Sequence, residues 1–468
     1  MRKNMIGPRL RQLRRDHGQT QAQMARALGV STAYVNLLEN NQRSLSVQML
    51  MGLADTYGVD WRDLIKDAGA HRLADLRGVL KDPLFGSEQP DVQELRAALD
   101  HAPRLVEHFL RLYNSHRTLL ENVTRLGQER MPESLLATSP ETVIHDFFRN
   151  HQNHFDVLER AAEKLRDETP CGSDDVYAML KGRLAKRHGV KVLLAPVEDM
   201  QHGLRVYDGE AARVVLSEAL DHSNRTFQLA HVLGLIELQK VLSRLTAGIR
   251  MQSEVGIARC HVELANYFAA AVIMPYKAFH EAAERTGYDV DRLAAAFGAS
   301  FEQVCQRLTT LQREGARGVP FFFLRVDKAG NVTKRFNSTS FKLAEHGGAC
   351  PVWNLHTAFR APGTIVPQFV ELPDGERFFT ISRTTDRPVF SRSTQDFRLA
   401  LALGCEIQHV ARIGYAASFN LRDERLFNPI GINCHLCPRQ ACAQRAHQPL
   451  FMELPIDTNR RGNTRYES

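Results

Sequence analysis

The feature that most constrains the fold of this chain is a pair of short helices joined by a glycine turn near the N-terminus. Thr20 is a good N-cap for a helix over residues 21–28, and Ser31 is a good N-cap for a helix over residues 32–39. Gly29 stands between the two stretches and supplies the tight turn, because glycine adopts left-handed backbone angles at little cost. The spacing therefore predicts an all-α bundle that begins with these helices.

This segment resembles the Cro/repressor-type (XRE) helix-turn-helix, through the pattern Gln21-x-x-x-Ala25-x-x-x-Gly29. In that type the second helix enters the major groove and its N-terminal side chains reach base edges. The resemblance implies a homodimer, or a higher homo-oligomer, on a palindromic site in double-stranded DNA. A helical bundle that does not bind DNA is the alternative. The DNA-binding residues it implies are Ser31, Thr32, Ala33, Tyr34 and Asn36 on the second helix, with Gln21 and Arg43 near phosphates.

The charge of the chain is concentrated in the same region. The formal net charge is +7, and residues 1–43 hold eight Lys and Arg against one Asp and one Glu, which leaves +6 there. A basic head on a nearly neutral body suits a polyanion such as DNA. A solvated basic helix face is the alternative explanation of the same charge.

The composition is that of a globular protein, with 43% hydrophobic and 24% charged residues. We expect no membrane span, because no apolar run approaches the ~20 residues that one needs. The N-terminus leads into arginines and not into an apolar stretch, so we expect no secretory signal and a cytoplasmic location.

The length of 468 residues predicts a multidomain protein. We expect a helix-turn-helix domain over 1–70, a helical linker or dimerisation arm over 71–150, an α+β domain over 151–325 and an α+β domain with an antiparallel sheet over 326–468. Hairpins are predicted over 204–216, 321–336 and 365–382, each around a turn that contains glycine. The arm carries heptad-like apolar positions, which are Leu95, Leu99, Val106, Leu110 and Tyr113.

Two stretches of the middle domain, 225–235 and 265–275, resemble the ImmA/IrrE-type metallopeptidase. An active member carries His-Glu-x-x-His on the first helix, which places two zinc ligands and a general base on one face. This chain keeps His231 but has Val232 and Leu235 at the other two positions. We therefore predict a degenerate scaffold that is not an enzyme, with His231 as a hydrogen-bonded helix residue. An improvised site from His222, His261 and Glu263 is the alternative.

The whole chain resembles the short-chain fatty acyl-CoA regulator family, a match that continues through residues 298–311 and 318–331. The resemblance implies regulation of propionate, acetate and glyoxylate metabolism and an acyl-CoA effector. Such a ligand needs cations for its phosphates and an apolar slot for its acyl chain. The candidate effector-binding residues are Tyr207, Arg225, Phe227, Lys240 and Arg244.

Three of the eight cysteines fall close together near the C-terminus, at Cys434, Cys437 and Cys442. They supply three metal ligands from one loop, and the fourth is expected to be Cys405 or Cys350. The family resemblance implies a 4Fe–4S cluster, which takes four cysteines. Zinc, with His435 or His447 as a further ligand, and a set of unliganded thiols are the two alternatives.

These observations together predict a sequence-specific transcriptional regulator whose DNA affinity changes with a short-chain acyl-CoA and with the state of a cluster. Two other functions remain open. The chain could be a zinc-dependent ImmA/IrrE-type peptidase that acts on a repressor, or a simple phage-type repressor.

Overall fold

The structure is a computed structural model, and it falls into two compact units, Met1–Arg117 and Thr118–Ser468. Each unit is described by itself. The structure describes residues 7–40, 42–43, 47–57, 69–82, 85, 90–125, 140–168, 175–200, 203–249, 254–341, 349–386, 398–454, 459, 462, 464 and 466. Cys171, one of the eight cysteines, and the cationic Arg250 of the middle domain lie outside the described residues.

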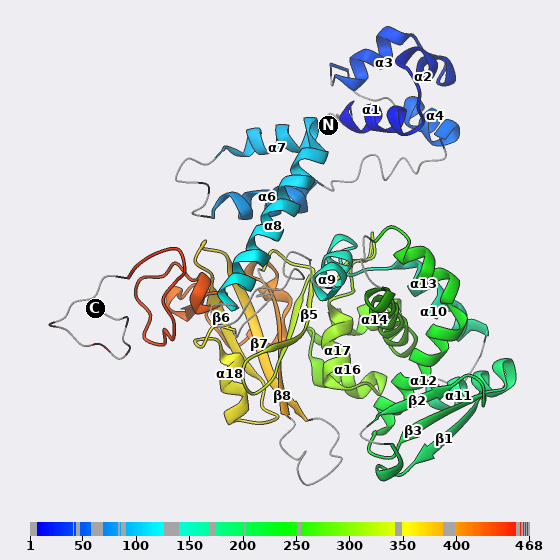
Figure 1. Ribbon diagram of the computed structural model, residues 1–468, viewed down its shortest axis with the longest axis vertical. Coiled ribbons are helices and arrows are strands. Elements are labelled where there is room, and N and C mark those ends of the chain that lie inside the picture. The colour runs from blue at the N-terminus through cyan, green and yellow to red at the C-terminus, as the bar shows by residue number, and fades with distance from the viewer. Residues whose placement is uncertain are drawn as a thin grey trace. The chain divides into compact units, whose positions relative to one another are not determined.

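The first unit begins with the predicted helical bundle (Figure 1). Its helices are α1 (Gly7–Asp16), α2 (Gln21–Ala27), α3 (Thr32–Glu39) and α4 (Val47–Tyr57). One apolar residue or more from each helix is buried in a shared core, which contains Leu10, Met24, Ala25, Val35, Leu38, Met49 and Leu53. The all-α first domain is thus confirmed.

Three further helices of this unit follow: α6 (Gly69–Leu80), α7 (Val92–His101) and α8 (Pro103–Arg125). The unit ends at Arg117, inside α8. Leu95 and Val106 are buried against Leu76, and Leu99 and Leu110 pack on the same small core. The heptad-like positions of the arm therefore serve its own packing. Leu105 and Leu112, seven residues apart on α8, are 70% exposed instead.

The second unit opens with α9 (Pro140–Asn150), α10 (Asp156–Glu168) and α11 (Val176–His188). A three-stranded sheet follows in the order β1-β3-β2, from β1 (Lys191–Ala195), β2 (Arg205–Asp208) and β3 (Arg213–Ser217), with the 3₁₀ turn η3 (Glu198–Met200) after β1. Strands β2 and β3 form the predicted antiparallel hairpin, while β1 pairs with β3 in parallel.

Six helices connect this sheet to the larger one: α12 (His222–Glu237), α13 (Gln239–Thr246), α14 (Glu254–Ile273), α15 (Tyr276–Thr286), α16 (Val290–Phe297) and α17 (Phe301–Leu308). Helices α12 and α14 cross closely at Gly234, where an added Cβ would lie 2.8 Å from Cδ1 of Phe268. None of the described helices is long and apolar enough to cross a membrane.

The larger sheet has the strand order β5-β4-β8-β7-β6-β9 (Figure 1). Its strands are β4 (Phe322–Val326), β5 (Val332–Asn337), β6 (Val366–Glu371), β7 (Arg377–Asp386), β8 (Arg398–Glu406) and β9 (Phe427–Pro429). All pairs are antiparallel except β6 with β9, so the predicted antiparallel sheet and its two hairpins are confirmed. Short turns complete the unit: α18 (Asn354–Thr357), η4 (Ala358–Arg360), η6 (Ile407–Arg412), η7 (Gly414–Ala416), η8 (Glu424–Leu426) and η9 (Cys434–Leu436).

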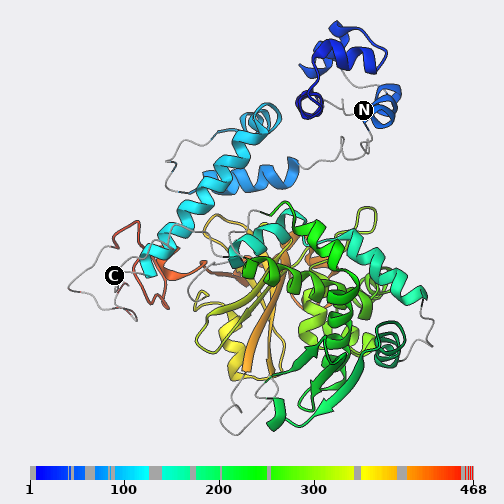
Figure 2. The same cartoon turned by 45° about the vertical axis from the view of Figure 1, so that its right-hand side comes forward.

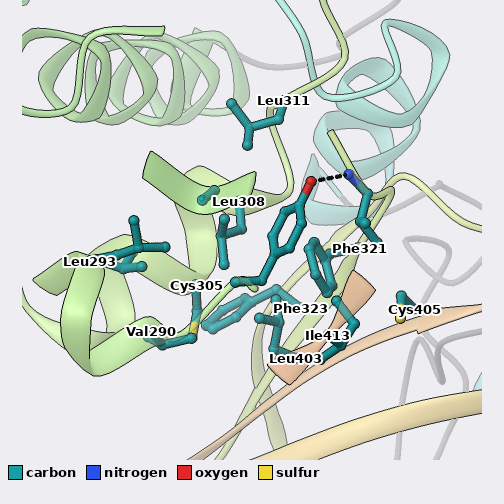
Figure 3. Close-up of a cluster of buried hydrophobic side chains, with 14 of the residues drawn as sticks. Val290, Leu293, Cys305, Leu308, Leu311, Phe321, Phe323, Leu403, Cys405 and Ile413 are labelled. Atoms are coloured by element: carbon teal, nitrogen blue, oxygen red, sulfur yellow. Dashed lines mark hydrogen bonds between the residues drawn. The ribbon is translucent and has the colours of Figure 1, made fainter. Parts of the chain in front are cut away.

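The helices and the larger sheet of this unit share one core. Figure 2 shows the yellow-to-orange strands lying beside the green helices. In Figure 3, Cys305 and Leu308 of α17 face Phe323 and Leu403 of the sheet. Arg307 of α17 is also fully buried, and it forms a bidentate ion pair with Glu159 of α10 at 2.6 and 2.9 Å. The second unit is therefore continuous through its interior.

Two predicted domain boundaries differ from these elements. The boundary between residues 325 and 326 passes through β4, whose apolar residues pair with β5 and β8, so the larger sheet begins at Phe322. The arm was predicted to extend to residue 150, but α9 packs in the second unit, with Phe148 buried beside Phe336 of β5. In both cases tertiary packing assigns an element that local sequence pattern leaves open.

Candidate functional site

The helix-turn-helix owes its shape to two side-chain caps and one turn. The hydroxyl of Thr20 accepts from the backbone N–H of Gln23, whose side chain accepts from the Thr20 backbone N–H in return. Ser31 Oγ accepts from the backbone N–H of Tyr34 at 3.1 Å. Gly29 has φ of +66°, the left-handed region that glycine adopts at least cost. The caps and the turn stand where the sequence places them.

The outer face of α3 presents exposed side chains near its N-terminus. Thr32, Ala33 and Asn36 are exposed, and Tyr34 is half-buried with the guanidinium of Arg43 5.3 Å from its ring centre. Gln21 Nε2 lies 3.5 Å from Asn36 Oδ1, so the first residue of α2 meets this face. The structure thus brings the predicted DNA-binding residues onto one continuous surface.

A buried carboxylate beneath that face locks α1, α2 and α3 together. Glu39 is 2% exposed and accepts hydrogen bonds from Arg14 Nε at 2.6 Å and Gln21 Nε2 at 2.8 Å. Burial alone would raise the pKa of Glu39, but these donors and the positive charge of Arg14 hold it below its usual range. Gln21 therefore positions α3 internally, and the phosphate contact remains a prediction.

The peptidase-like helix α12 carries a histidine that is hydrogen-bonded to an arginine. His231 is buried, and its Nδ1 accepts from Arg205 Nη1 of β2 at 2.7 Å. Burial and the adjacent Arg205 charge lower the pKa of His231 to about 4. His231 is thus a neutral, hydrogen-bonded helix residue, as the sequence predicted.

The improvised metal site considered for this region is not assembled. Glu263 pairs with Lys334 of β5 at 3.2 Å, and His261 Nε2 hydrogen-bonds Thr246 Oγ1 at 2.9 Å. His222 lies beside the ring of Tyr177 at the start of α12. Among the described residues, no three His, Cys, Asp or Glu side chains are placed to hold a single metal ion.

The five candidate effector residues do not converge, which corrects their grouping. Arg225 lies near the start of α12, where its Nη2 donates to the carbonyl of Glu218 at 2.9 Å. Lys240 and Arg244 are exposed on α13, beyond the far end of α12, roughly 18 Å along the helix axis at 1.5 Å per residue. Tyr207 is 39% exposed on β2, and Phe227 packs between two apolar clusters. The length of α12 therefore separates Arg225 from Lys240 and Arg244, although the three cations are close in the sequence.

The C-terminal cysteines, by contrast, meet in one pocket. Four thiols line it, from Cys350, Cys434, Cys437 and Cys442. The remaining lining residues are Pro351, Pro429, Gly431, Asn433, Arg439 and Arg445. Cys405 is not among them. It lies on β8, fully buried in the apolar core that also holds Phe379, and burial raises the pKa of its thiol to about 12. The fourth thiol of this pocket is therefore that of Cys350, and Cys405 does not line it.

Local backbone contacts hold this loop in place. Asn433 Oδ1 accepts from the backbone N–H of Leu436 at 2.9 Å and starts the turn η9. Gly431 passes so close to Cys437 that an added Cβ would lie 2.7 Å from its Sγ. Burial raises the pKa of the Cys350 thiol, while hydrogen bonds from the backbone of Gly431 and Val352 oppose that rise.

Two histidines near the loop stack on each other. The rings of His435 and His447 lie 4.5 Å apart at 16°. Neither is among the described residues that line the pocket. This arrangement gives no support to a mixed cysteine and histidine ligand set.

Models of known protein families match three successive regions of the chain. A helix-turn-helix family model matches residues 10–64, and the IrrE N-terminal-like domain matches residues 185–309. The model of the short-chain fatty acyl coenzyme A regulator C-terminal domain matches residues 310–466. The chain is 39% identical over 463 residues to the propionyl-CoA carboxylase regulator of Cereibacter sphaeroides, and 98% of each chain is covered. The chain belongs to the short-chain fatty acyl-CoA regulator family.

Other members of this family are similar over nearly the whole chain. Two HTH-type transcriptional regulators of Mycobacterium tuberculosis, RamB and PrpR, are 32% and 33% identical, with at least 95% of each chain covered. A solved Mycobacterium tuberculosis transcriptional regulator matches with a TM-score of 0.67 and 34% identity, over 71% of this chain and 100% of that one. The protein is therefore a DNA-binding transcriptional regulator, and the predicted resemblance is confirmed.

Several residues that shape these sites escape sequence reasoning. Arg14 was counted only as charge, although it pairs with Glu39. Arg205 stands at the start of a predicted strand. The alternation of side chains along a strand predicts which face of the sheet Arg205 occupies, but it does not predict that His231 is its partner. Arg439 and Arg445 are read as loop residues until the pocket is seen. A long-range partner leaves no local pattern.

Proposed function

We propose that this member of the family regulates short-chain acyl-CoA metabolism, and that its DNA affinity changes when an acyl-CoA binds to the second unit. The state of His231 carries the proposal: the peptidase-like helices remain packed, while Arg205 occupies the nitrogen that a metal would need. A scaffold without peptidase chemistry, in a chain that also has a DNA-reading head, suits a sensor. The Cereibacter sphaeroides relative is a propionyl-CoA carboxylase regulator, which supports a role in acyl-CoA metabolism.

The effector acts through linkage. If an acyl-CoA and DNA prefer different arrangements of the protein, each weakens or strengthens the binding of the other by the same factor. The protein acts in the cytoplasm, where its DNA lies, as a homodimer on a palindromic operator. Sedimentation analysis of the full chain tests the homodimer, and a monomer at micromolar concentration would contradict it.

Fluorescence anisotropy with promoter DNA from the protein's own gene and its neighbours tests the effector. We expect propionyl-CoA or acetyl-CoA to change the dissociation constant roughly 5–150-fold, the usual range of allosteric coupling. Free coenzyme A serves as the ligand control. Asn36→Ala should weaken DNA binding with and without effector, by about 1–3 kcal/mol if Asn36 reads a base. Equal DNA affinity with and without acyl-CoA would refute this part of the proposal.

The alternative function as a peptidase makes an opposite prediction. A zinc peptidase needs a metal-bound water and a general base on the first helix. In this chain Arg205 occupies His231 Nδ1, and Glu263 is paired with Lys334. We expect no zinc-dependent cleavage of a repressor substrate. Proteolysis that requires zinc and disappears in His231→Ala would support the peptidase instead.

We also propose that the cysteine pocket holds a 4Fe–4S cluster, with Cys350, Cys434, Cys437 and Cys442 as ligands. Four thiols line one pocket, which is the number of cysteines that such a cluster takes as ligands. The bound cluster would supply sensitivity to oxidants or to iron supply.

Anaerobic purification with iron and sulfide analysis tests this cofactor. We expect a brown protein that loses its visible absorption in Cys437→Ser and in Cys350→Ser. Cys405→Ser is the matched control, because Cys405 is buried in the sheet core away from the pocket, and its colour should persist. A colourless wild type with stoichiometric zinc would favour the simple repressor with a structural zinc site.

A further inference from the structure

Two arginines line the cysteine pocket, and each is held by backbone carbonyls. Arg445 is only 4% exposed, and its guanidinium donates to the carbonyls of Cys434, Arg439 and His447. Arg439 donates to the carbonyls of Ile430 and Glu371, at 3.3 and 2.8 Å. Arg445 therefore connects three residues of the cysteine loop through hydrogen bonds, and Arg439 connects that loop to the end of β6.

Neither guanidinium has a carboxylate partner within the part of the chain that the structure describes. Carbonyl groups satisfy N–H donors but do not neutralise the positive charge. A buried charge is costly unless an opposite charge offsets it. Buried Arg445 and half-buried Arg439, both beside one pocket, thus indicate that the pocket takes an occupant of negative charge.

One donor of Arg445 also remains unused. Its Nε is buried and has no hydrogen-bond partner, while both Nη atoms are engaged. A buried N–H without an acceptor costs about 1–3 kcal/mol. The same side chain lines the pocket with the four thiols, so a sulfur atom in the pocket is the acceptor that its surroundings offer.

We propose that Arg445 is a positioning residue for the bound cluster, to which its Nε–H donates a hydrogen bond, and that Arg445 and Arg439 together offset the cluster's negative charge. This inference rests on the proposed 4Fe–4S cofactor. Four thiolates around an oxidised 4Fe–4S core carry a net charge of about −2, and two arginines match it. Hydrogen bonds to sulfur and nearby charge are two of the factors that set the reduction potential of such clusters.

The sign of the effect follows from charge. Reduction adds an electron to the cluster, so a nearby positive charge stabilises the reduced form more than the oxidised form. Removal of the Arg445 charge should therefore lower the reduction potential. We expect Arg445→Gln to change the ratio of reduced to oxidised cluster at a fixed potential by about tenfold, which is a fall of about 59 mV for a one-electron couple.

Redox titration of the anaerobically purified full chain, followed by the EPR signal of the reduced cluster, tests the inference. Arg445→Lys keeps the charge but loses the planar guanidinium, and we expect its potential to lie closer to the wild type than that of Arg445→Gln. Arg439→Gln should lower the potential by less, because Arg439 is only half-buried. Arg425→Gln is the matched control: Arg425 is 90% exposed and already paired with Asp423, so its loss should leave the potential unchanged.

The outcomes separate the inference from the cofactor on which it rests. A wild type without iron and sulfide overturns the cluster and the inference together. A wild type that holds the cluster, with Arg445→Gln at the same potential and iron content, overturns the inference alone. If Arg445→Gln fails to hold iron, the potential of Arg439→Gln decides: a fall supports charge compensation, and an unchanged potential contradicts it.

Discussion

The peptidase-like helix and the cysteine pocket both combine an arginine with metal-ligating side chains, but in opposite ways. At α12, Arg205 donates directly to His231 Nδ1, so that nitrogen is not available to a metal. In the pocket, Arg445 donates to backbone carbonyls and leaves the four thiols unobstructed. The partner that an arginine takes thus decides whether a site is closed or available. A ligand-type residue in the sequence does not by itself indicate which of the two is present.

The largest expected effect is a loss of iron affinity when a substitution obstructs the cysteine pocket. In Gly431→Ala the new Cβ would lie 2.7 Å from Cys437 Sγ and 3.0 Å from its Cβ, so the thiol must turn away from its place in the pocket. We expect iron affinity to fall at least ~10-fold, as when other residues that orient metal ligands are altered. Iron analysis after anaerobic reconstitution measures it.

Gly182→Ala is the control for that substitution. Gly182 lies inside α11, and an added Cβ would meet no atom within 4 Å. Its iron content should equal the wild type, with a gain in stability of roughly 0.5–1 kcal/mol. If Gly431→Ala retains full iron content, the close approach at Cys437 is not what keeps the pocket available.

Arg307 is a buried arginine that does have a carboxylate partner, and removal of that partner should lower the free energy of unfolding. Arg307 and Glu159 are both almost fully buried, and the attraction between them outweighs burial and keeps the pKa of Glu159 low. Glu159→Ala leaves that arginine charge unpaired, so we expect a loss of about 3–5 kcal/mol in the free energy of unfolding. Urea denaturation of the second unit's transition measures it.

The double substitution Glu159→Leu with Arg307→Met is the matched test. Replacing both partners of a buried ion pair with apolar groups is often close to neutral. The double variant should therefore recover most of the stability that Glu159→Ala loses. A double variant as unstable as the single one would show that the pair contributes more than mutual neutralisation.

The closed site predicts a dependence of stability on pH. The folded-state pKa of His231 is about 4, below the ordinary value of 6.5, so the unfolded chain binds a proton first as pH falls. The stability contributed by the neutral imidazole is complete above pH ~6.5 and is lost as pH falls toward 4. Between pH 7 and pH 5 we expect His231 to account for about 2 kcal/mol of that loss.

Unfolding experiments on the wild type and His231→Gln at both pH values isolate this contribution. The glutamine variant cannot take up the proton, so its stability should fall less across the interval. The same pH dependence in both proteins would contradict a depressed pKa. Arg205→Gln should reduce the dependence only in part, because burial contributes more than the arginine charge.

Local signals in the sequence were enough to predict the helix-turn-helix, because its caps and its turn act between residues that are close in the chain. The caps at Thr20 and Ser31 and the turn at Gly29 act within three or four residues. The cysteine pocket was predicted only in part. Cys350 and Cys405 both precede Cys434 by many residues, and neither has a neighbouring sequence that distinguishes a ligand from a core thiol.

The topology of the larger sheet places Cys350, and not Cys405, beside the cysteine loop. Strand β9 pairs with β6 in parallel, and the N–H of Ile430 donates to the carbonyl of Glu371, which places the cysteine loop at that edge of the sheet. Cys350 precedes α18, which contacts β6, whereas Cys405 faces the core from β8. A parallel pair between strands more than fifty residues apart is beyond the reach of sequence periodicity.

The smallest expected effect is a change in the effector response when exposed cations of α13 are removed. Lys240 and Arg244 are exposed on α13, and the length of α12 separates them from Arg225, so the three cations do not form one phosphate site. In a double Lys240→Ala, Arg244→Ala variant we expect the acyl-CoA effect on DNA binding to change by less than about twofold, within ~0.5 kcal/mol. Anisotropy titrations with propionyl-CoA measure it. A loss of the effector response would show that the exposed cations of α13 bind the ligand.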